Sequence, residues 1–238
     1  MKPISELKVK LFADGADRAQ ILASRSNPLI RGFTTNPTLM RAAGVKDYEA
    51  FAREILEVVS DQPISFEVFA DEFCEMERQA RKIGSWAENV YVKIPVTNTK
   101  RQSSMDLVHR LSNSGLKINV TAVLTLDQVR DSAAALAGGA PAVVSVFAGR
   151  IADTGRDPVP MMAAAVELVS MYPNIELIWA SPRELLNIFQ ADDVGCHIIT
   201  ATESVLAKLK TIGKDLNDYS LETVLMFHTD AARSSYQL

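Results

Sequence analysis

The sequence predicts an α/β fold, a single (β/α)8 barrel of the TIM type with one additional C-terminal helix. Short β-rich runs alternate with longer amphipathic segments along the whole chain, a pattern typical of a parallel sheet. Eight such units follow one another without a linker rich in proline, glycine and serine, which favours a closed barrel. An open doubly wound sheet is the alternative. No GxGxxG motif follows the first strand, and its absence weakens a dinucleotide-binding version.

The predicted strands are short apolar runs with many β-branched residues. They cover residues 7–14, 30–36, 64–70, 90–97, 117–124, 142–149, 174–181 and 196–202. Helical periodicity lies between them, for example over residues 48–60, 71–84, 103–113, 126–137 and 160–172. A last helical pattern over residues 221–234 gives the additional helix. We expect residues 1–238 to form one domain, since single barrels of this length are common.

Composition and charge exclude several classes of partner. The chain is 47% hydrophobic and 23% charged, as in an ordinary globular protein with ample core. Its formal net charge is −4 and it carries no basic stripe, which argues against nucleic acid. No run of 18 apolar residues predicts a membrane span, and the N-terminal residues lack the apolar centre of a signal peptide. We expect a cytoplasmic protein.

The cysteines and histidines do not predict a disulfide or a metal site. Cys74 and Cys196 are far apart and lack CxxC spacing, which fits buried thiols in a reducing compartment. His109, His197 and His228 are scattered, and no two of them have metal-ligand spacing. We expect no metal and no other cofactor.

Side-chain alternation brings a set of polar residues onto one face of the predicted sheet. Successive side chains of a strand point to opposite faces, and the continuous apolar face should meet the helices. The other face then carries Glu67, Lys93, Asn119, Thr121 and Ser145 from four strands. Parallel strands buried on both faces are usually apolar throughout. A cluster of inward polar residues therefore indicates a site rather than packing.

Lys93 lies in the middle of an apolar run, residues 91–97. Burial disfavours a charged ammonium, and a neutral buried lysine can form a Schiff base with a carbonyl substrate. The alternative is a lysine at a strand end whose ammonium reaches water.

Five motifs along the chain carry a resemblance to a known family. They are Leu-Phe-Ala-Asp-Gly (11–15), Gly-Phe-Thr-Thr-Asn-Pro-Thr (32–38), Tyr-Val-Lys-Ile-Pro-Val-Thr (91–97), Ile-Asn-Val-Thr-Ala-Val-Leu (118–124) and Ser-Val-Phe-Ala-Gly-Arg-Ile-Ala-Asp (145–153). The set resembles the transaldolase family, which also contains small fructose-6-phosphate aldolases. The resemblance covers nearly the whole chain, and the Thr-Thr-Asn-Pro and Val-Lys-Ile-Pro motifs are highly specific as a pair.

The resemblance implies class I chemistry, without metal, in one catalytic domain. Lys93 matches the Schiff-base lysine of the family, and Asp14 matches its general acid/base, which deprotonates a sugar hydroxyl so that a carbon–carbon bond breaks. The alternative for Asp14 is a cap at the N-terminus of the following helix. Glu67 matches the glutamate that holds a proton-shuttling water together with Thr121. A solvated strand residue and an ion-pair partner of Lys93 are the alternatives for Glu67.

The resemblance also implies substrate contacts. Thr35, Asn36, Asn119, Ser145 and Phe147 match positions around the dihydroxyacetone unit. An amide can donate and accept hydrogen bonds, which suits sugar hydroxyls. Turn formation before a proline is the alternative for Asn36, and a backbone hydrogen bond is the alternative for Ser145.

The resemblance implies that the substrate phosphate is bound by Arg150, Ser181 and Arg183. The sequence departs from the family at Pro182, where relatives usually carry an aromatic residue, and a proline there could displace Arg183. Asp153 is expected to orient Arg150. Either arginine could instead be an ordinary surface charge.

Two positions bear on the reaction. The aldolase branch tends to carry glutamine at the position of Glu67 and tyrosine at the position of Phe147. We therefore expect a transaldolase of the pentose phosphate pathway, which transfers a dihydroxyacetone unit from fructose 6-phosphate or sedoheptulose 7-phosphate to an aldose phosphate. An aldolase that releases dihydroxyacetone, a relative acting on a modified sugar and a non-catalytic sugar-phosphate-binding protein are the alternatives. The chain length is closer to that of the aldolase branch. We also expect a homo-oligomer.

Overall fold

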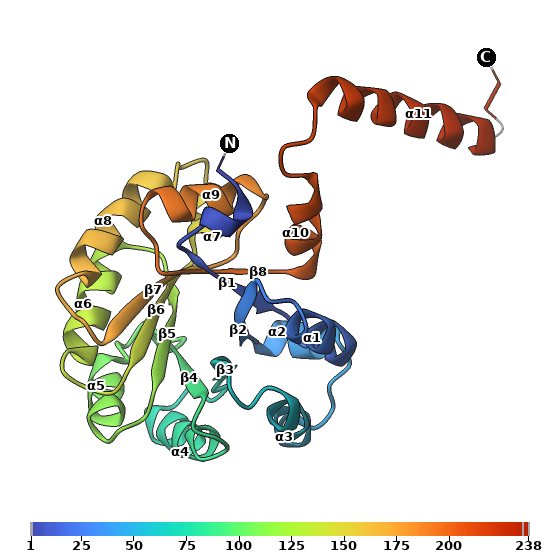
Figure 1. The fold of residues 1–238 in the computed structure, drawn as a ribbon. Coiled ribbons are helices and arrows are strands. Elements are labelled where there is room, and N and C mark those ends of the chain that lie inside the picture. The colour runs from blue at the N-terminus through green and yellow to red at the C-terminus, as the bar shows by residue number, and fades with distance from the viewer. Residues whose placement is uncertain (1, 235, 238) are drawn as a thin grey trace.

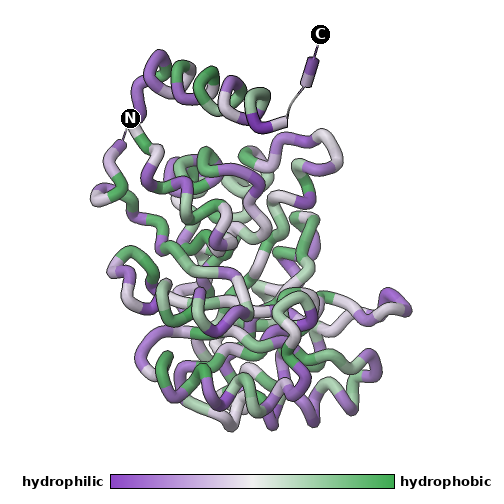
Figure 2. The backbone as a smooth tube through the Cα atoms, turned by 90° about the vertical axis from the view of Figure 1, so that its right-hand side faces the viewer, coloured by the Kyte–Doolittle hydropathy of each residue, from purple (hydrophilic) through white to green (hydrophobic). Residues whose placement is uncertain are grey.

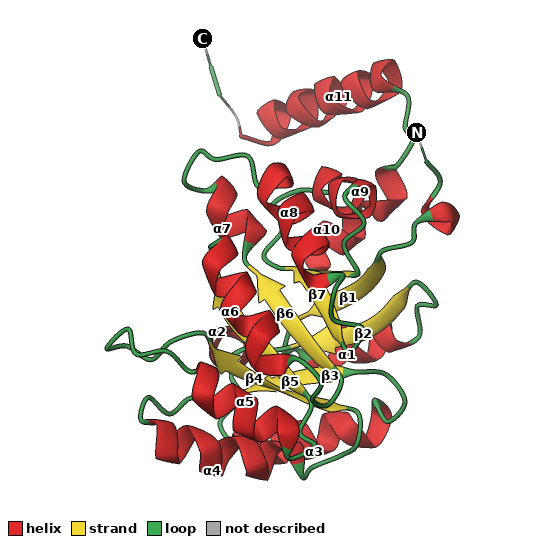
Figure 3. Ribbon diagram, turned by 90° about the vertical axis from the view of Figure 1, so that its left-hand side faces the viewer, coloured by secondary structure: helices red, strands yellow, loops and turns green. Residues whose placement is uncertain are grey.

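The computed structural model describes residues 2–234 and 236–237, and its strands close into a parallel eight-stranded barrel. The predicted (β/α)8 fold is confirmed, with the helices outside the strands (Figures 1 and 3). Every strand pairs with its neighbour in the sequence, and β1 also pairs with β8 to close the barrel. The strands are β1 (Lys10–Asp14), β2 (Ile30–Thr34), β3 (Ile64–Glu67), β4 (Val90–Pro95), β5 (Ile118–Val123), β6 (Ala142–Val146), β7 (Ile175–Trp179) and β8 (Ile198–Ala201).

Each helix that the sequence predicted begins and ends close to its predicted limits. They are α1 (Arg18–Arg25), α2 (Pro37–Ala42), α3 (Tyr48–Val58), α4 (Phe73–Gly84), α5 (Met105–Asn113), α6 (Leu126–Leu136), α7 (Ala148–Ala152), α8 (Val159–Val169), α9 (Leu186–Asp193), α10 (Glu203–Leu206) and α11 (Leu216–Ser234), with 3₁₀ turns η1 (Ile4–Glu6) and η2 (Ala207–Thr211).

The strands are shorter than predicted because turns and helix starts occupy their ends. The first strand begins at Lys10 because the 3₁₀ turn η1 and an irregular segment precede it. The sixth ends at Val146 because the chain turns into α7, so Arg150 lies on a short helix rather than on a strand. Local caps fix such starts: the side chain of Asp17 accepts a hydrogen bond from the backbone N–H of Gln20 at the N-terminus of α1.

The core has two parts. Outward side chains of the strands pack against the helices, and Phe33, Phe66 and Trp179 are among the largest that are fully buried. A smaller cluster fills the barrel interior and includes Phe12 and Ile178. The Phe12 ring lies so close to β2 that a Cβ on Gly32 would come 2.5 Å from it, so any larger residue at position 32 would force the ring to move. The interior layer supports the polar residues at the carboxyl ends of the strands.

Helix α11 stands away from the barrel (Figures 1 and 2). None of its residues is buried, and Leu221, Val224, Leu225 and Phe227 expose more than half of their surface. The additional C-terminal helix is therefore confirmed, although it begins at Leu216 instead of residue 221. That the whole chain forms one domain stays a prediction.

Candidate active site

A cavity of about 440 Å³ opens at the carboxyl ends of the strands. Nine of the predicted site residues line it: Asp14, Asn36, Glu67, Lys93, Thr121, Ser145, Phe147, Arg150 and Ser181. A larger cavity, of about 650 Å³, lies at the opposite ends of the strands, where Lys10, Tyr91 and Glu176 line it. We assign the chemistry to the smaller cavity, because it alone of these two contains Lys93 and both carboxylates.

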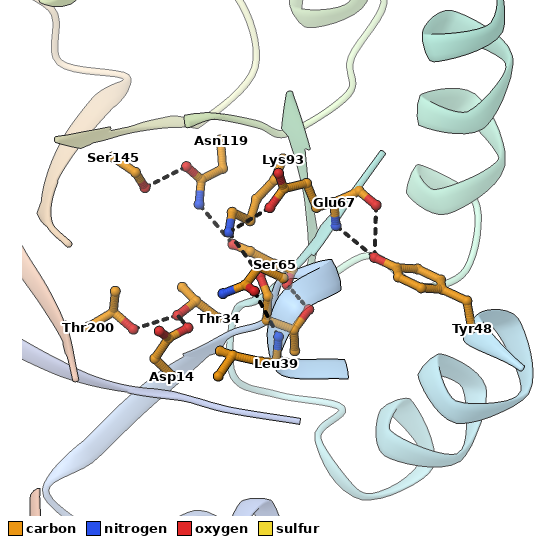
Figure 4. A network of polar contacts seen from close by, with 12 residues as sticks. Asp14, Thr34, Leu39, Tyr48, Ser65, Glu67, Lys93, Asn119, Ser145 and Thr200 are labelled. Carbon is orange, nitrogen blue, oxygen red and sulfur yellow. Dashed lines mark hydrogen bonds and ion pairs between the residues drawn. The ribbon is translucent and has the colours of Figure 1, made fainter. Parts of the chain in front are cut away.

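Lys93 projects from β4 into the floor of the site (Figure 4). Its side chain is only 7% exposed. The Nζ atom donates a hydrogen bond to the backbone oxygen of Thr35 at 2.8 Å and forms an ion pair with Glu67 Oε2 at 3.0 Å. The ion-pair alternative for Glu67 is thus present, and it is compatible with chemistry because a carboxylate at this distance can take the lysine proton directly.

Asp14 ends β1 next to a chain of two hydroxyls (Figure 4). Thr34 Oγ1 donates to Asp14 Oδ1 at 2.7 Å, and Thr200 Oγ1 lies 2.5 Å from Thr34 Oγ1. Burial raises the pKa of Asp14, although the charge of Lys93 and the Thr34 hydrogen bond act in the opposite direction. A carboxyl group with a raised pKa can take and return a proton near neutral pH. Asp14 does not cap α1, because Asp17 does.

Glu67 is held through its backbone by a tyrosine. The Tyr48 hydroxyl accepts a hydrogen bond from Glu67 N–H and donates one to Glu67 C=O, both at 2.8 Å. Burial raises the pKa of Tyr48, so its hydroxyl stays protonated. The ring packs edge-on against Phe66 and Phe69 and tilts against Trp86. These contacts fix the end of β3, from which the Glu67 side chain extends toward Lys93.

Thr121 has a hydroxyl, unpaired among the described residues, in the cavity that also contains Lys93 and Glu67. It lines the cavity, and its Oγ1 has no hydrogen-bond partner among the described residues. The register of β5 with β6 shifts between Val120 and Val123, and Ala122 adopts a left-handed φ of 61°. Such an irregularity can re-aim a neighbouring side chain, and strained backbone is common at functional sites. The orphan hydroxyl suits a water or a substrate oxygen.

The two asparagines are both engaged in the fold. Asn36 Oδ1 caps α2 by accepting from Leu39 N–H at 2.9 Å, so the turn alternative is present, while the residue still lines the cavity. Asn119 is fully buried and lies below the cavity wall. Its Nδ2 donates to Ser65 Oγ at 3.1 Å, and its Oδ1 accepts from Ser145 Oγ at 2.7 Å (Figure 4). Ser145 reaches the cavity and is anchored by this bond.

Thr35 also lies behind the cavity wall. It is fully buried, and its hydroxyl donates to the backbone oxygen of Ser65 at 2.9 Å. Its own carbonyl accepts the hydrogen bond from Lys93. The structure therefore brings Thr35 to the lysine rather than to the lining of the cavity.

The predicted phosphate residues are divided. Arg150 and Ser181 line the cavity, and the Arg150 guanidinium lies over the Phe147 ring at 5.5 Å. Arg183 does not line the cavity. Its Nε donates to Asp153 Oδ1 at 2.9 Å, and a second guanidinium nitrogen contacts Asp153 Oδ2. Asp153 thus pairs with Arg183 and not, as expected, with Arg150.

Sequence reasoning missed four supporting residues: Thr34, Tyr48, Ser65 and Thr200. Thr34 lies inside a motif that was recognised, and side-chain alternation along β2 would have placed it on the inner face. Tyr48 carried no signal, because its partner is a backbone group of another element.

Metal binding and membrane spanning find no support in the described residues. Across residues 2–234 and 236–237, histidine, cysteine, aspartate and glutamate nowhere gather in threes that could hold a metal ion. In the same part of the chain, no helix combines the length and apolar character needed to cross a membrane.

Comparison with solved structures supports the fold. KGPDC from Streptococcus mutans superposes with a TM-score of 0.57 at 10% identity, and the match covers 85% of this chain and 91% of that one. A mandelate oxidase variant gives a TM-score of 0.58 at 15% identity, with 90% of this chain and 75% of that chain covered. Similarity at this level of identity shows a shared barrel.

Comparison with sequences shows the family. A protein named "Probable transaldolase" from Streptococcus agalactiae is 34% identical over 218 residues, which cover 91% of this chain and 96% of the relative. One of the same name from Dehalococcoides mccartyi is 33% identical over 202 residues, which cover 84% of this chain and 90% of the relative. The family described as transaldolase/fructose-6-phosphate aldolase matches residues 11–237. The chain belongs to this family.

Proposed function

We propose that the protein is a metal-independent class I transaldolase that uses Lys93 to transfer a dihydroxyacetone unit from a ketose phosphate to an aldose phosphate. The observation that carries this proposal is the buried Lys93 amine, 3.0 Å from Glu67 and in the same cavity as Asp14, whose pKa is raised. One carboxylate is available to the amine and the other to a substrate hydroxyl, which is the division of labour that Schiff-base chemistry needs.

The first half of the reaction joins the ketose to the enzyme. Glu67 takes a proton from Lys93 Nζ, and the neutral amine attacks the ketone carbon to give a carbinolamine. The carbinolamine hydroxyl is then protonated and leaves as water, which gives an iminium ion. Thr121 Oγ1 and the Glu67 carboxylate are suited to hold that water, since the hydroxyl has no partner among the described residues.

The second half breaks and remakes a carbon–carbon bond. In the bound ketose the iminium carbon is C2. Asp14 takes the proton from the hydroxyl on C4, and the bond between C3 and C4 breaks. An aldose phosphate leaves, and an enamine stays on Lys93. The enamine carbon attacks the aldehyde of an acceptor, Asp14 returns its proton to the new alkoxide, and water releases the product ketose.

Phe147 favours transfer over cleavage. It lines the cavity and has no hydroxyl that could donate a proton to the enamine. An enamine that is not protonated persists until an aldehyde arrives. We therefore propose that transfer is the reaction. As its setting we propose fructose 6-phosphate or sedoheptulose 7-phosphate as donor and a cytoplasmic role in the pentose phosphate pathway. Release of free dihydroxyacetone is the alternative function.

Borohydride trapping tests the proposal. Reduction in the presence of fructose 6-phosphate should add a dihydroxyacetone-derived mass to the peptide that contains residues 92–94. Label on another lysine, or no label with active protein, would contradict the assignment.

With erythrose 4-phosphate as acceptor, formation of sedoheptulose 7-phosphate should far exceed acceptor-free release of dihydroxyacetone, and Phe147→Tyr should raise that release. Equal rates with and without acceptor would favour the aldolase. Activity should also survive exhaustive chelation.

We also propose that the protein forms a homo-oligomer. The support is helix α11, whose apolar side chains Leu221, Val224, Leu225 and Phe227 are exposed. Exposed apolar patches of this kind are typical of protein interfaces. Light scattering should give the mass of two or more chains of 26.1 kDa, and removal of residues 216–238 should reduce the number of chains per particle. A monomer at micromolar concentration would contradict the proposal.

A further inference from the structure

We propose that Asp153 holds the Arg183 guanidinium away from the substrate phosphate and thereby sets how strongly the site binds phosphorylated substrates. This inference rests on the proposed function for the identity of the substrate, but its physical content is a competition between two anions for one arginine. The carboxylate of Asp153 belongs to the protein, and the phosphate belongs to the ligand.

The Asp153–Arg183 pair uses one of the two forked edges of the guanidinium, formed by Nε and one terminal nitrogen. Arg183 Nε donates to one carboxylate oxygen at 2.9 Å, and a terminal nitrogen contacts the other oxygen. This is the two-pronged arrangement in which arginine also binds phosphate. Because these N–H groups of Arg183 already bind Asp153, Arg183 cannot present this edge to a phosphate until Asp153 is displaced. The hydrogen bond from Arg183 also lowers the pKa of Asp153, which favours the ionised form of the competing carboxylate.

The backbone on both sides of the pair is fixed, so the pair is more than two mobile side chains meeting. Arg183 N–H donates to Asn187 Oδ1 at 2.8 Å, and Ser181 adopts a left-handed φ of 58°. A Cβ on Gly149 would lie 1.5 Å from the Ser181 carbonyl oxygen, so α7 packs directly against this loop. Pro182 stiffens the segment between them. The contact between α7 and the loop brings Asp153 and Arg183 together.

Arg150 provides the contrast. It lies on α7, three residues before the C-cap Asp153, lines the cavity and rests on the Phe147 ring. Within the described residues it forms no ion pair with a carboxylate. The site therefore has one arginine that faces the cavity and one that is held outside it by its own carboxylate.

The strength of the competition follows from exposure. The side chains of Arg183 and Asp153 are 47% and 53% exposed. An ion pair this exposed contributes little, so a phosphate can displace Asp153 at the cost of roughly a two- to fivefold loss of affinity. Asp153 then lowers phosphate affinity without abolishing it.

The test uses Asp153→Asn, which keeps the shape of the side chain and removes its charge. Titration with inorganic phosphate should show about two- to fivefold tighter binding than in the wild type. KM for erythrose 4-phosphate should fall by a similar factor, while KM for unphosphorylated glyceraldehyde should not change. The matched control is Asp61→Asn, because Asp61 forms an exposed pair with Arg25 at 2.7 Å and lines the cavity at the opposite end of the barrel.

A second variant shows whether the gain passes through Arg183. In Asp153→Asn/Arg183→Gln, phosphate affinity should return to the wild-type value or below. Weaker phosphate binding in Asp153→Asn would overturn the inference, because Asp153 would then orient Arg183 toward the ligand. An equal gain in Asp61→Asn would reduce the effect to net charge and overturn it as well. The phosphate titration needs no turnover, so a protein that binds phosphate as expected but fails to transfer dihydroxyacetone would refute the proposed function alone.

Discussion

The floor of the site, around Lys93 and Asp14, and its rim, around Arg150 and Arg183, are built differently. At the floor, Lys93 and Asp14 are largely enclosed: Lys93 donates a hydrogen bond to the Thr35 carbonyl just after β2, and Asp14 accepts one from Thr34 on β2. At the rim, Arg150 and Arg183 lie in or beside a short helix and a loop, and both are exposed. Buried polar groups are costly unless their partners are fixed, whereas exposed charges can exchange partners at little cost. The difference implies that the fold fixes the chemistry at the floor and leaves substrate affinity adjustable at the rim.

The largest effect should come from Lys93→Arg at the floor. Arginine keeps the positive charge, and with it the partner of Glu67, but it cannot serve as a neutral amine nucleophile. Transfer activity and borohydride trapping should both fall below detection while the fold is retained by circular dichroism. Lys208→Arg, at an exposed position, is the matched control. Residual trapping on another lysine would show that the nucleophile lies elsewhere, and the floor would then not be the site of the chemistry.

Asp14→Asn should lower the transfer rate by roughly 10²–10⁴-fold, because the amide can accept the Thr34 hydrogen bond but cannot take a proton. The acid limb of the wild-type pH–rate profile should lie above the range of an ordinary carboxyl group, since burial raises the pKa of Asp14. A loss of less than tenfold, or an acid limb near pH 4, would assign the proton transfer to another group.

The same variant should gain stability. The pKa of Asp14 is higher in the folded state than in the unfolded state. At a pH between these two pKa values the folded protein keeps a proton that the unfolded chain has lost, so stability falls as pH rises through that range. The ionised carboxylate therefore destabilises the fold, with no penalty below the unfolded pKa and the full penalty above the folded one. Tm of Asp14→Asn should match the wild type below about pH 4 and exceed it at neutral pH. An equal Tm at pH 7 would show that the site compensates the buried charge fully.

The rim should respond in KM rather than in turnover. Under the proposed function, Arg150→Ala should remove a charge-assisted contact with the phosphate of about 1.5–3 kcal/mol, which corresponds to roughly a ten- to hundredfold rise in KM for phosphorylated substrates. KM for glyceraldehyde should stay near the wild-type value, and Arg156→Ala serves as the control on an exposed arginine nearby. A fall in kcat larger than the rise in KM would place Arg150 with the floor residues.

Side-chain alternation predicted the floor well because it is a local property of a strand. The inward positions of Glu67, Lys93, Asn119 and Ser145 follow from a period of two residues, and parallel strands side by side bring them together. Alternation does not say which polar group holds which. The hydroxyls that support Asp14 and the tyrosine that supports Glu67 come from other elements, and their roles depend on strand register and helix packing.

The rim was predicted less well because it lies beyond the strand ends. Alternation stops where β6 and β7 end, and the conformation of the following segments decides which carboxylate an arginine meets. The expected partner of Asp153 was Arg150, three residues away along the chain. Packing of Gly149 against Ser181 brings Arg183 to Asp153 instead. Sequence distance was therefore a poor guide to pairing at the rim.

The smallest effect should come from Tyr48→Phe, which acts on the floor from outside the cavity. The ring can keep its contacts with Phe66 and Trp86, but Glu67 loses the hydroxyl that satisfies both its backbone N–H and its C=O. An unsatisfied buried group costs about 1–3 kcal/mol, so urea unfolding should show a loss of that size. The rate of borohydride trapping should fall by about tenfold or less, since the Glu67 carboxylate is displaced rather than removed.

Tyr172→Phe is the control for that experiment, because the Tyr172 hydroxyl makes no hydrogen bond with the described residues. It should leave both stability and trapping near the wild-type values. If Tyr48→Phe lowers stability while the trapping rate and its pH dependence stay unchanged, Tyr48 supports the barrel without positioning Glu67. The floor would then owe its geometry to the strands alone, and the contrast with the rim would rest on burial and on hydrogen bonds within the barrel.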